Sequence, residues 1–329
     1  MILIYRFLTF LFYPILIVLI FFRKLLNKED RFRYKEKIFP FFFSPDKNDK
    51  KKLIWFHAAS IGEAQSVFPL IQKINIENND VEFLITTTTL SAGNIITKKF
   101  HKFKNIKHRY FPLDVNFLIK NFLSKWKPNL IIFVDSEIWP NLIFEIKKRK
   151  IPLALINGRI TKKTLKKWML VSTFANKIFG NFDLCLAASK DSEENLRKLN
   201  VKNLKFLGNI KFSGKIEKND LIDKNLKILK QKKNWCAAST HKGEEIICIK
   251  THLNLKKIYK DLITIIIPRH ISRSYEINKL CNKYKLTSQI LNDNELIDDR
   301  NEIIIINYFG SLSKFYNYSK SVFIGKSMI

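Results

Sequence analysis

Short apolar runs that end at small or polar residues recur along this chain, and they restrict its fold more than any other feature. Each run is rich in Ile, Val, Leu or Phe and is too short for a helix, and charged stretches of helical length separate many of them. This alternation predicts βαβ units, with parallel sheets covered by helices on both faces. We expect strands at 53–59, 81–88, 108–113, 130–135, 153–157, 184–188 and 204–207, and in a second series at 235–238, 262–267, 286–290, 303–307 and 322–324.

A lysine-rich stretch at 213–233 separates the two series of strands. A chain of 329 residues is long enough for two domains. We therefore predict two doubly wound α/β domains, at 53–212 and 213–329. The polar stretch 44–52 (SPDKNDKKK) is typical of a linker that precedes the first domain.

The N-terminal segment is apolar in a way that the rest of the chain is not. Between Met1 and Phe22 the only charged residue is Arg6. The uncharged run from Phe7 onward would span ~24 Å as a helix, and counting from Met1 reaches the roughly 30 Å of a bilayer core if Arg6 snorkels to the surface. Seven basic residues then follow within 23–37, which by the positive-inside rule places this side in the cytoplasm. We predict a membrane anchor at 1–24 and a basic juxtamembrane segment and linker at 25–52; a buried core helix is the alternative.

The formal net charge of +30, from 59 basic and 29 acidic residues, favours an anionic partner such as nucleic acid, a membrane surface or a phosphorylated substrate. An AT-rich genome, which favours Lys, Ile, Asn and Phe codons, is an alternative source of the lysines. No nucleic-acid-binding motif is present, so we expect no nucleic-acid partner. The four cysteines and six histidines have no metal-binding spacing, so we expect a reducing compartment and no metal.

Two acidic residues follow strands of the first series. Glu63 lies in the stretch HAASIGE, where Ser60 and Glu63 are spaced as in a capping box. The alternative is a general base whose pKa is raised by burial or by a like charge, with Gly62 leaving room for a bulky acceptor. Glu137 follows the strand at 130–135 in the same way, and acids favoured at a helix N-terminus are the alternative interpretation there. Since these strand ends share one edge of the sheet, we expect Glu63 and Glu137 to be neighbours.

Lys211 closes the first series of strands, where a cation can stabilise a negatively charged leaving group. In a chain this basic, an ordinary surface lysine is the alternative.

The second series also has polar strand ends. Its first strand leads into a polar loop that begins a helix, a place suited to an anion. Arg269, after Pro268, can grip a phosphate with two hydrogen bonds. Together these polar strand ends predict a nucleotide or nucleotide-sugar site. The chain lacks the glycine patterns of dinucleotide-binding and P-loop proteins, which disfavours those two classes. The residues concerned are Ser239, Thr240, His241, Pro268, Arg269, Gly310, Ser311 and Leu312.

Taken in order, several stretches resemble the bacterial 3-deoxy-D-manno-octulosonic acid (Kdo) transferases of lipopolysaccharide synthesis. They are RFRYKEKIF, HAASIGE, ITTTTLSAG, YFPLD, DSEIWPNL, LINGRI, LGNIKF, STHKGEE, PRH and FGSLSKFY. The resemblance implies a GT-B fold of two Rossmann-like domains that face each other across a cleft. It also implies an inverting, metal-independent and cofactor-free transfer of Kdo from CMP-Kdo to the lipid A precursor lipid IVA.

The resemblance also implies roles for individual residues. Glu63 would be the general base, and Glu137 and Lys211 would stabilise the transition state. Pro268, Arg269 and the loop Gly310-Ser311-Leu312 would bind CMP. Ser60, Gly62, Ser239, Thr240 and His241 would support these groups.

This chain departs from the family pattern in two places. Asp135 stands where the family has a glutamate, which makes Glu137 the more critical acid. The chain also ends at Ile329, before the family's glycine-rich CMP-binding stretch and C-terminal helices, so we expect an incomplete second domain.

We expect an inner-membrane protein on the cytoplasmic side, held by a single-pass or monotopic anchor, with anionic lipid as a partner; nothing indicates the oligomeric state. The alternatives are a truncated, non-catalytic lipid-binding protein at the membrane and another GT-B glycosyltransferase acting on a lipid.

Overall fold

The chain forms two units in the computed structural model, Met1–Lys215 and Ile216–Ile329. The structure describes all residues except 44, 46, 211–220, 309 and 327–329. Each unit is described by itself below.

The first unit is built on a seven-stranded, fully parallel sheet in the order β3-β2-β1-β4-β5-β6-β7. Every strand predicted in this region is present, with its ends shifted by at most a few residues, because uninterrupted apolar runs are what a sheet buried on both faces requires. Strand β2, for example, is buried along its whole length. The strands are β1 (Lys52–His57), β2 (Val81–Thr87), β3 (Ile106–Tyr110), β4 (Leu130–Val134), β5 (Leu153–Gly158), β6 (Leu184–Ala187) and β7 (Leu204–Phe206).

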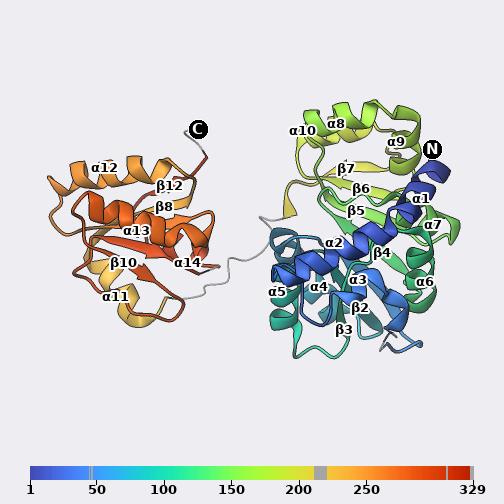
Figure 1. Cartoon of the computed structure of the whole chain (residues 1–329), viewed down its shortest axis with the longest axis horizontal. Helices are drawn as coiled ribbons and strands as arrows, with labels where there is room; N and C mark the ends of the chain where they lie inside the picture. The colour runs from blue at the N-terminus through green and yellow to red at the C-terminus, as the bar shows by residue number, and fades with distance from the viewer. Residues whose placement is uncertain (44, 46, 211–220, 309, 327–329) are drawn as a thin grey trace. The chain divides into compact units, whose positions relative to one another are not determined.

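Helices cover both faces of this sheet (Figure 1). Alternate strand residues point to opposite faces: Phe56 packs in one core with α4 and α5, whereas Trp55 packs in the other core with α6, α7 and α9. The helices are α4 (Ile61–Glu77), α5 (Leu90–Phe100), α6 (Asn116–Trp126), α7 (Pro140–Lys148), α8 (Lys162–Met169), α9 (Ser172–Phe179) and α10 (Lys190–Arg197).

The N-terminal segment is two helices rather than the single one that was expected. Helices α1 (Ile2–Leu11) and α2 (Tyr13–Leu25) meet at an angle of 54°. Pro14, in the first turn of α2, explains the break, because proline lacks an N–H and disfavours helical geometry in the residue before it. Among the described residues no single helix is long and apolar enough to cross a bilayer; the bent pair meets that criterion only when both helices are counted together.

The helix pair is attached to the outside of the first unit (Figure 1), where α1 contacts α6 and α7. The Tyr5 hydroxyl donates to Asp114 at 3.0 Å, and Arg6 pairs with Glu145 at 3.0 Å. Ile20 is the only buried residue of the pair, so the alternative prediction of a buried core helix is wrong. After α2, residues 26–38 (here called the connector) include the short helix α3 (Lys35–Ile38), and the turn η1 (Pro40–Phe42) follows.

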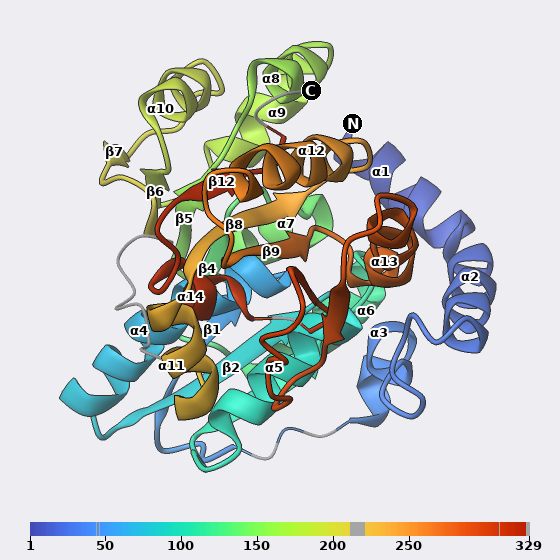
Figure 2. The ribbon, with the colours of Figure 1, turned by 90° about the vertical axis from the view of Figure 1, so that its left-hand side faces the viewer.

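The second unit is a five-stranded parallel sheet in the order β10-β11-β9-β8-β12. Its strands match the second predicted series: β8 (Lys233–Thr240), β9 (Leu262–Pro268), β10 (Ser288–Leu291), β11 (Ile303–Ile306) and β12 (Val322–Ile324). Apolar residues of α11 (Asp223–Gln231) and α14 (Leu312–Tyr316) pack on one face of this sheet, and those of α12 (Glu244–Lys256) and α13 (Ser274–Lys283) pack on the other. The ribbons of these helices can be followed in Figure 2. The predicted fold class, parallel α/β in two units, is therefore confirmed.

Candidate functional site

The strand order places a topological switch point in the first unit. From β1 the chain first moves to β2 and β3, and later to β4 on the opposite side of β1. In open parallel sheets, ligands bind beyond the carboxyl ends of the two strands where this reversal occurs. The loop after β1 leads to Glu63, and the loop after β4 contains Glu137.

Glu63 takes part in a hydrogen-bonded cap at the start of α4. Its Oε1 accepts from the Ser60 hydroxyl at 2.8 Å, and its Oε2 accepts from the Ala59 N–H at 2.8 Å. The Glu63 N–H in turn donates to Ser60 Oγ at 3.4 Å. The capping-box interpretation is thus confirmed, with the reciprocal bond made to Ala59 rather than to the Ser60 N–H.

Capping does not exclude a catalytic role for Glu63. Burial raises the pKa of its carboxyl, and the hydrogen bonds from Ser60 and Ala59 only partly oppose that shift. Repulsion from Glu137 and Asp135 raises the pKa of the Glu63 carboxyl further. A Cβ placed on Gly62 would meet no atom within 4 Å, so the space beside Glu63 is open.

Glu137 is held by side chains that sequence reasoning missed. His57, the last residue of β1, places Nε2 3.3 Å from Glu137 Oε2, and the indole N–H of Trp139 donates to the same oxygen at 3.0 Å. On the other side of the imidazole, His57 Nδ1 lies 2.9 Å from the Thr86 hydroxyl. The one available signal was a histidine at the end of an otherwise apolar strand.

Indole donors lie at both ends of this network. Trp55 Nε1–H donates to Thr86 Oγ1 at 2.8 Å. Trp139 Nε1–H lies within hydrogen-bonding distance of both His57 Nε2, at 3.1 Å, and Glu137 Oε2, at 3.0 Å. These contacts hold the Glu137 carboxyl group beside the end of β1.

Asp135 and Lys211 complete the predicted set in this unit. Asp135 is buried with a left-handed backbone (φ 64), and the Ser136 hydroxyl donates to its Oδ1 at 3.2 Å. Lys211 lies outside the described residues. Just before it, the Ile210 N–H donates to Asn157 Oδ1 at 3.2 Å, which ties that segment to the end of β5.

In the second unit the predicted residues follow the carboxyl ends of three adjacent strands, β11, β9 and β8. Arg269 is exposed, and its guanidinium has no hydrogen-bond or ion-pair partner among the residues that the structure describes. Its backbone N–H donates to Thr240 O at 3.0 Å, and Pro268 is buried within β9. Gly310 has φ +81, a conformation that favours glycine, and leads through the buried Ser311 to Leu312, where α14 begins.

The loop Ser239-Thr240-His241 is less open to an anion than its sequence indicated. The His241 N–H donates to Glu244 Oε2 at 2.7 Å, so the first turn of α12 supplies its own carboxylate there. Glu244 is fully buried and also accepts from the Lys326 N–H at 2.6 Å. This structural carboxylate, which the sequence analysis missed, joins the ends of β8 and β12.

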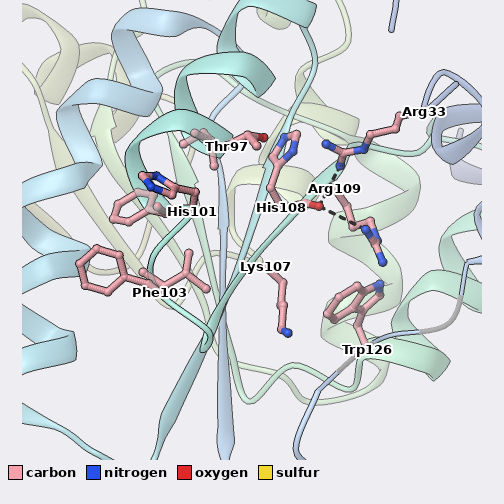
Figure 3. Close-up of a pocket in the computed structure, with 11 residues that line it drawn as sticks. Arg33, Thr97, His101, Phe103, Lys107, His108, Arg109 and Trp126 are labelled. Atoms are coloured by element: carbon pink, nitrogen blue, oxygen red, sulfur yellow. Dashed lines mark hydrogen bonds between the residues drawn. The ribbon is translucent and has the colours of Figure 1, made fainter. Parts of the chain in front are cut away.

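A cavity of about 280 Å³ lies elsewhere, at the outer edge of β3 (Figure 3). Its polar lining includes Arg33, Lys107, His108 and Arg109, with Trp126 forming part of its wall. Burial and the two arginines lower the pKa of His108 to about 3, so this imidazole is neutral. None of the predicted site residues lines the cavity. Among the described residues there is also no group of three His, Cys, Asp or Glu side chains arranged to hold a metal ion.

Comparison with known proteins identifies relatives. Residues 30–214 match the family model described as 3-deoxy-D-manno-octulosonic-acid transferase (kdotransferase). The 3-deoxy-D-manno-octulosonic acid transferase of Rickettsia bellii is 35% identical over 326 residues, covering 98% of this chain and 76% of the relative. That of Rickettsia felis is 31% identical, covering 84% of this chain and 60% of the relative. That of Haemophilus influenzae is 28% identical, covering 84% and 65%.

Solved structures support the fold. A UDP-GlcNAc 2-epimerase from Neisseria meningitidis superposes with a TM-score of 0.55 at 17% identity, covering 83% of this chain and 77% of that one. A glycosyltransferase from Rickettsia africae superposes with a TM-score of 0.52 at 13% identity, covering 84% and 73%. With its two parallel α/β units, the chain has a fold of the GT-B type.

Proposed function

The chain belongs to the 3-deoxy-D-manno-octulosonic acid transferase family of glycosyltransferases, and on that premise we propose that it transfers Kdo from CMP-Kdo to a hydroxyl of the lipid A precursor lipid IVA. The observation that carries the proposal is that Glu63 and Glu137 follow the two strands of the β1/β4 switch point, with the pKa of Glu63 raised by burial and by repulsion from Glu137. A raised pKa suits a group that must take a proton near neutral pH.

In the proposed reaction, Glu63 removes the proton from the acceptor hydroxyl. The acceptor oxygen attacks the anomeric carbon of Kdo, and the bond from that carbon to the phosphate oxygen breaks with its electron pair, releasing CMP. Attack opposite the leaving group inverts the anomeric configuration. Glu137, held in place by His57 and Trp139, would stabilise positive charge that develops on the sugar ring.

The second unit would hold the nucleotide. Arg269 is exposed at the end of the central strand of three and is free to form a two-point contact with phosphate. Together with Lys211, it would neutralise the departing CMP without a divalent cation. Arg269→Ala is expected to weaken CMP binding, measured by calorimetry, by about 10-fold or more, the usual worth of a charged hydrogen bond. An unchanged affinity would mean that the donor site lies elsewhere.

The N-terminal helices would attach the chain to the membrane surface. Their large apolar side chains are mostly exposed, including Phe7, Phe10, Ile15 and Phe22, and such a face partitions into the boundary between head groups and acyl chains. Because the helices are bent and bonded to the first unit, we propose a monotopic attachment at the cytoplasmic face of the inner membrane. The cationic surface of the chain would add attraction to anionic lipid.

Turnover by the purified full chain tests the proposal. The chain is incubated in detergent with CMP-Kdo and lipid IVA, with and without EDTA, and the lipid product is analysed by mass spectrometry. We expect the mass to increase by whole Kdo units and the rate to be insensitive to EDTA. Binding of the lipid without transfer would overturn the proposal in favour of a lipid-binding protein, and transfer of a different sugar would assign another glycosyltransferase.

A further inference from the structure

We infer that Lys37 is a positioning residue that links the N-terminal helices to the loop that orients Glu63. This inference rests on the proposed function, which gives Glu63 its role as base. Lys37 lies in α3, at the end of the connector, and its side chain is 5% exposed. Lys37 lies within the stretch RFRYKEKIF, but neither that stretch nor the charge count distinguished it from the neighbouring basic residues.

The Lys37 side chain contacts two partners, one beside the N-terminal helices and one after β2. Its ammonium group forms an ion pair with Glu29, whose side chain is 1% exposed, and donates to the backbone carbonyl of Thr88 at 2.7 Å. Glu29 also accepts from Arg23 Nε at 2.7 Å, in the last turn of α2. A continuous set of charged contacts therefore runs from α2 to the segment that follows β2.

That segment is bonded directly to the loop before Glu63. The N–H groups of Thr88 and Thr89 donate to the Ala59 carbonyl at 3.2 and 3.3 Å. The N–H of the same residue, Ala59, donates to Glu63 Oε2. Ala59 is thus held on one side by the segment that Lys37 fixes, and it fixes the Glu63 carboxylate on the other.

The rest of the connector is bonded to the edge of the sheet. Arg33 donates to the His108 carbonyl at 2.9 Å, Glu36 accepts from the Tyr110 N–H at 2.7 Å, and the Leu113 N–H donates to the Lys37 carbonyl at 2.9 Å. The partners lie in β3 or just after it. None of these contacts uses the Lys37 side chain, so they would hold the connector in its absence. Of the side-chain contacts described for the connector, only that of Lys37 reaches the segment bonded to Ala59.

The chemistry of the Lys37–Glu29 ion pair favours a role in positioning the loop over a role in stabilising the fold. A buried ion pair contributes little net stability, because the cost of removing both charges from water offsets their attraction. Its geometry, however, is specific, since each ammonium donor needs an acceptor in the correct place. We infer that the pair fixes the position of the Thr88 carbonyl, and that membrane attachment of α2 and orientation of Glu63 are coupled through it.

The test compares two double variants of the full chain. Lys37→Met with Glu29→Gln removes both charges, leaves an acceptor for Arg23, and abolishes the contact with Thr88. Arg6→Met with Glu145→Gln is the matched control, because that pair also joins an N-terminal helix to the first unit but has no contact with the loop before Glu63. The readouts are thermal midpoint, kcat and KM for Kdo transfer, and amide hydrogen exchange of residues 58–63.

We expect the Lys37/Glu29 variant to keep the thermal midpoint and the KM for CMP-Kdo of the wild type. Its kcat should fall about 10- to 100-fold, as expected when a catalytic group is misplaced, and the amide hydrogens of residues 58–63 should exchange faster. Lys37→Arg, which keeps a donor, should restore part of kcat, and the control should match wild type. Wild-type kcat and exchange in the Lys37/Glu29 variant, or an equal loss in the control, would overturn the inference. A wild-type chain without transferase activity would overturn the proposed function instead. Hydrogen exchange at residues 58–63 would then be the measurement that tests whether Lys37 holds the loop before Glu63.

Discussion

The candidate base Glu63 shows how a single residue can serve structure and chemistry together. Its two carboxylate oxygens accept from Ser60 and Ala59 in a cap, yet its pKa is raised because burial outweighs those hydrogen bonds. The cap was predictable, since Ser60 and Glu63 have the spacing of a local motif. The contact of His57 with Glu137 was not, because it joins residues 80 positions apart and depends on β1 lying beside β4.

The raised pKa of Glu63 predicts the pH dependence of transfer. Only the ionised carboxylate can act as a base, so kcat/KM should rise with pH through a pKa above the ordinary glutamate value. Asp135→Asn removes one repelling charge and tolerates the left-handed backbone at that position. The acidic limb of the kcat/KM profile should therefore move to lower pH in this variant. A limb that stays in place, or moves to higher pH, would show that Asp135 does not act on the titrating group.

At the scale of elements, strands were predicted well and helix attachments poorly. Strands such as β2 and β9 are buried along their whole length, and an uninterrupted apolar run carries that information. The bend between α1 and α2 was missed although Pro14 marks it, because a mostly apolar segment was taken as one span. The start of α7 depends on Asp114, 26 residues before Pro140, which no local pattern reveals.

Asp114 is predicted to stabilise the helix that follows Glu137 and Trp139. Its carboxylate accepts from the N–H groups of Asn141 and Leu142 at 2.9 and 3.0 Å, and burial raises its pKa to about 6. Asp114→Ala leaves both buried donors unpaired, which should lower the free energy of unfolding by about 3 kcal/mol. Asp114→Asn, which keeps one acceptor, should cost less. Urea denaturation of both variants measures this, and equal stability of Asp114→Ala and wild type would contradict the assignment.

At the scale of the whole molecule, the exposed apolar face of α1 and α2 and the charge of +30 favour attachment to an anionic membrane surface. Composition led to the prediction of a membrane partner, but it did not reveal how the N-terminal segment is attached to the first unit. The ties through Tyr5, Arg6 and the connector are tertiary contacts between residues far apart in sequence. Lys37 in particular could not be distinguished among 59 basic residues until its burial was known.

Membrane attachment can be tested without disturbing those ties. Phe7 and Phe22 are 64% and 59% exposed on the helix pair, so Phe7→Glu with Phe22→Glu should leave the fold intact. Each apolar side chain contributes about 1.5–3 kcal/mol when buried, so binding to anionic vesicles should weaken at least about 100-fold in a flotation assay. Ile76→Glu, at an 81% exposed position of α4, is the control and should bind like wild type. Equal binding by all three proteins would place the lipid contact elsewhere.

The most direct test of the account is the rate of Kdo transfer by Glu63→Gln beside wild type. Glutamine has the same shape. Its carbonyl oxygen can accept from the Ala59 N–H, and its amide N–H can donate to Ser60 Oγ, so the thermal midpoint should change little, but glutamine cannot take the acceptor proton. We predict a loss of at least about 100-fold in kcat for transfer from CMP-Kdo to lipid IVA, the usual worth of a general base. A folded Glu63→Gln protein that transfers Kdo at the wild-type rate would contradict the assignment of Glu63 as the base.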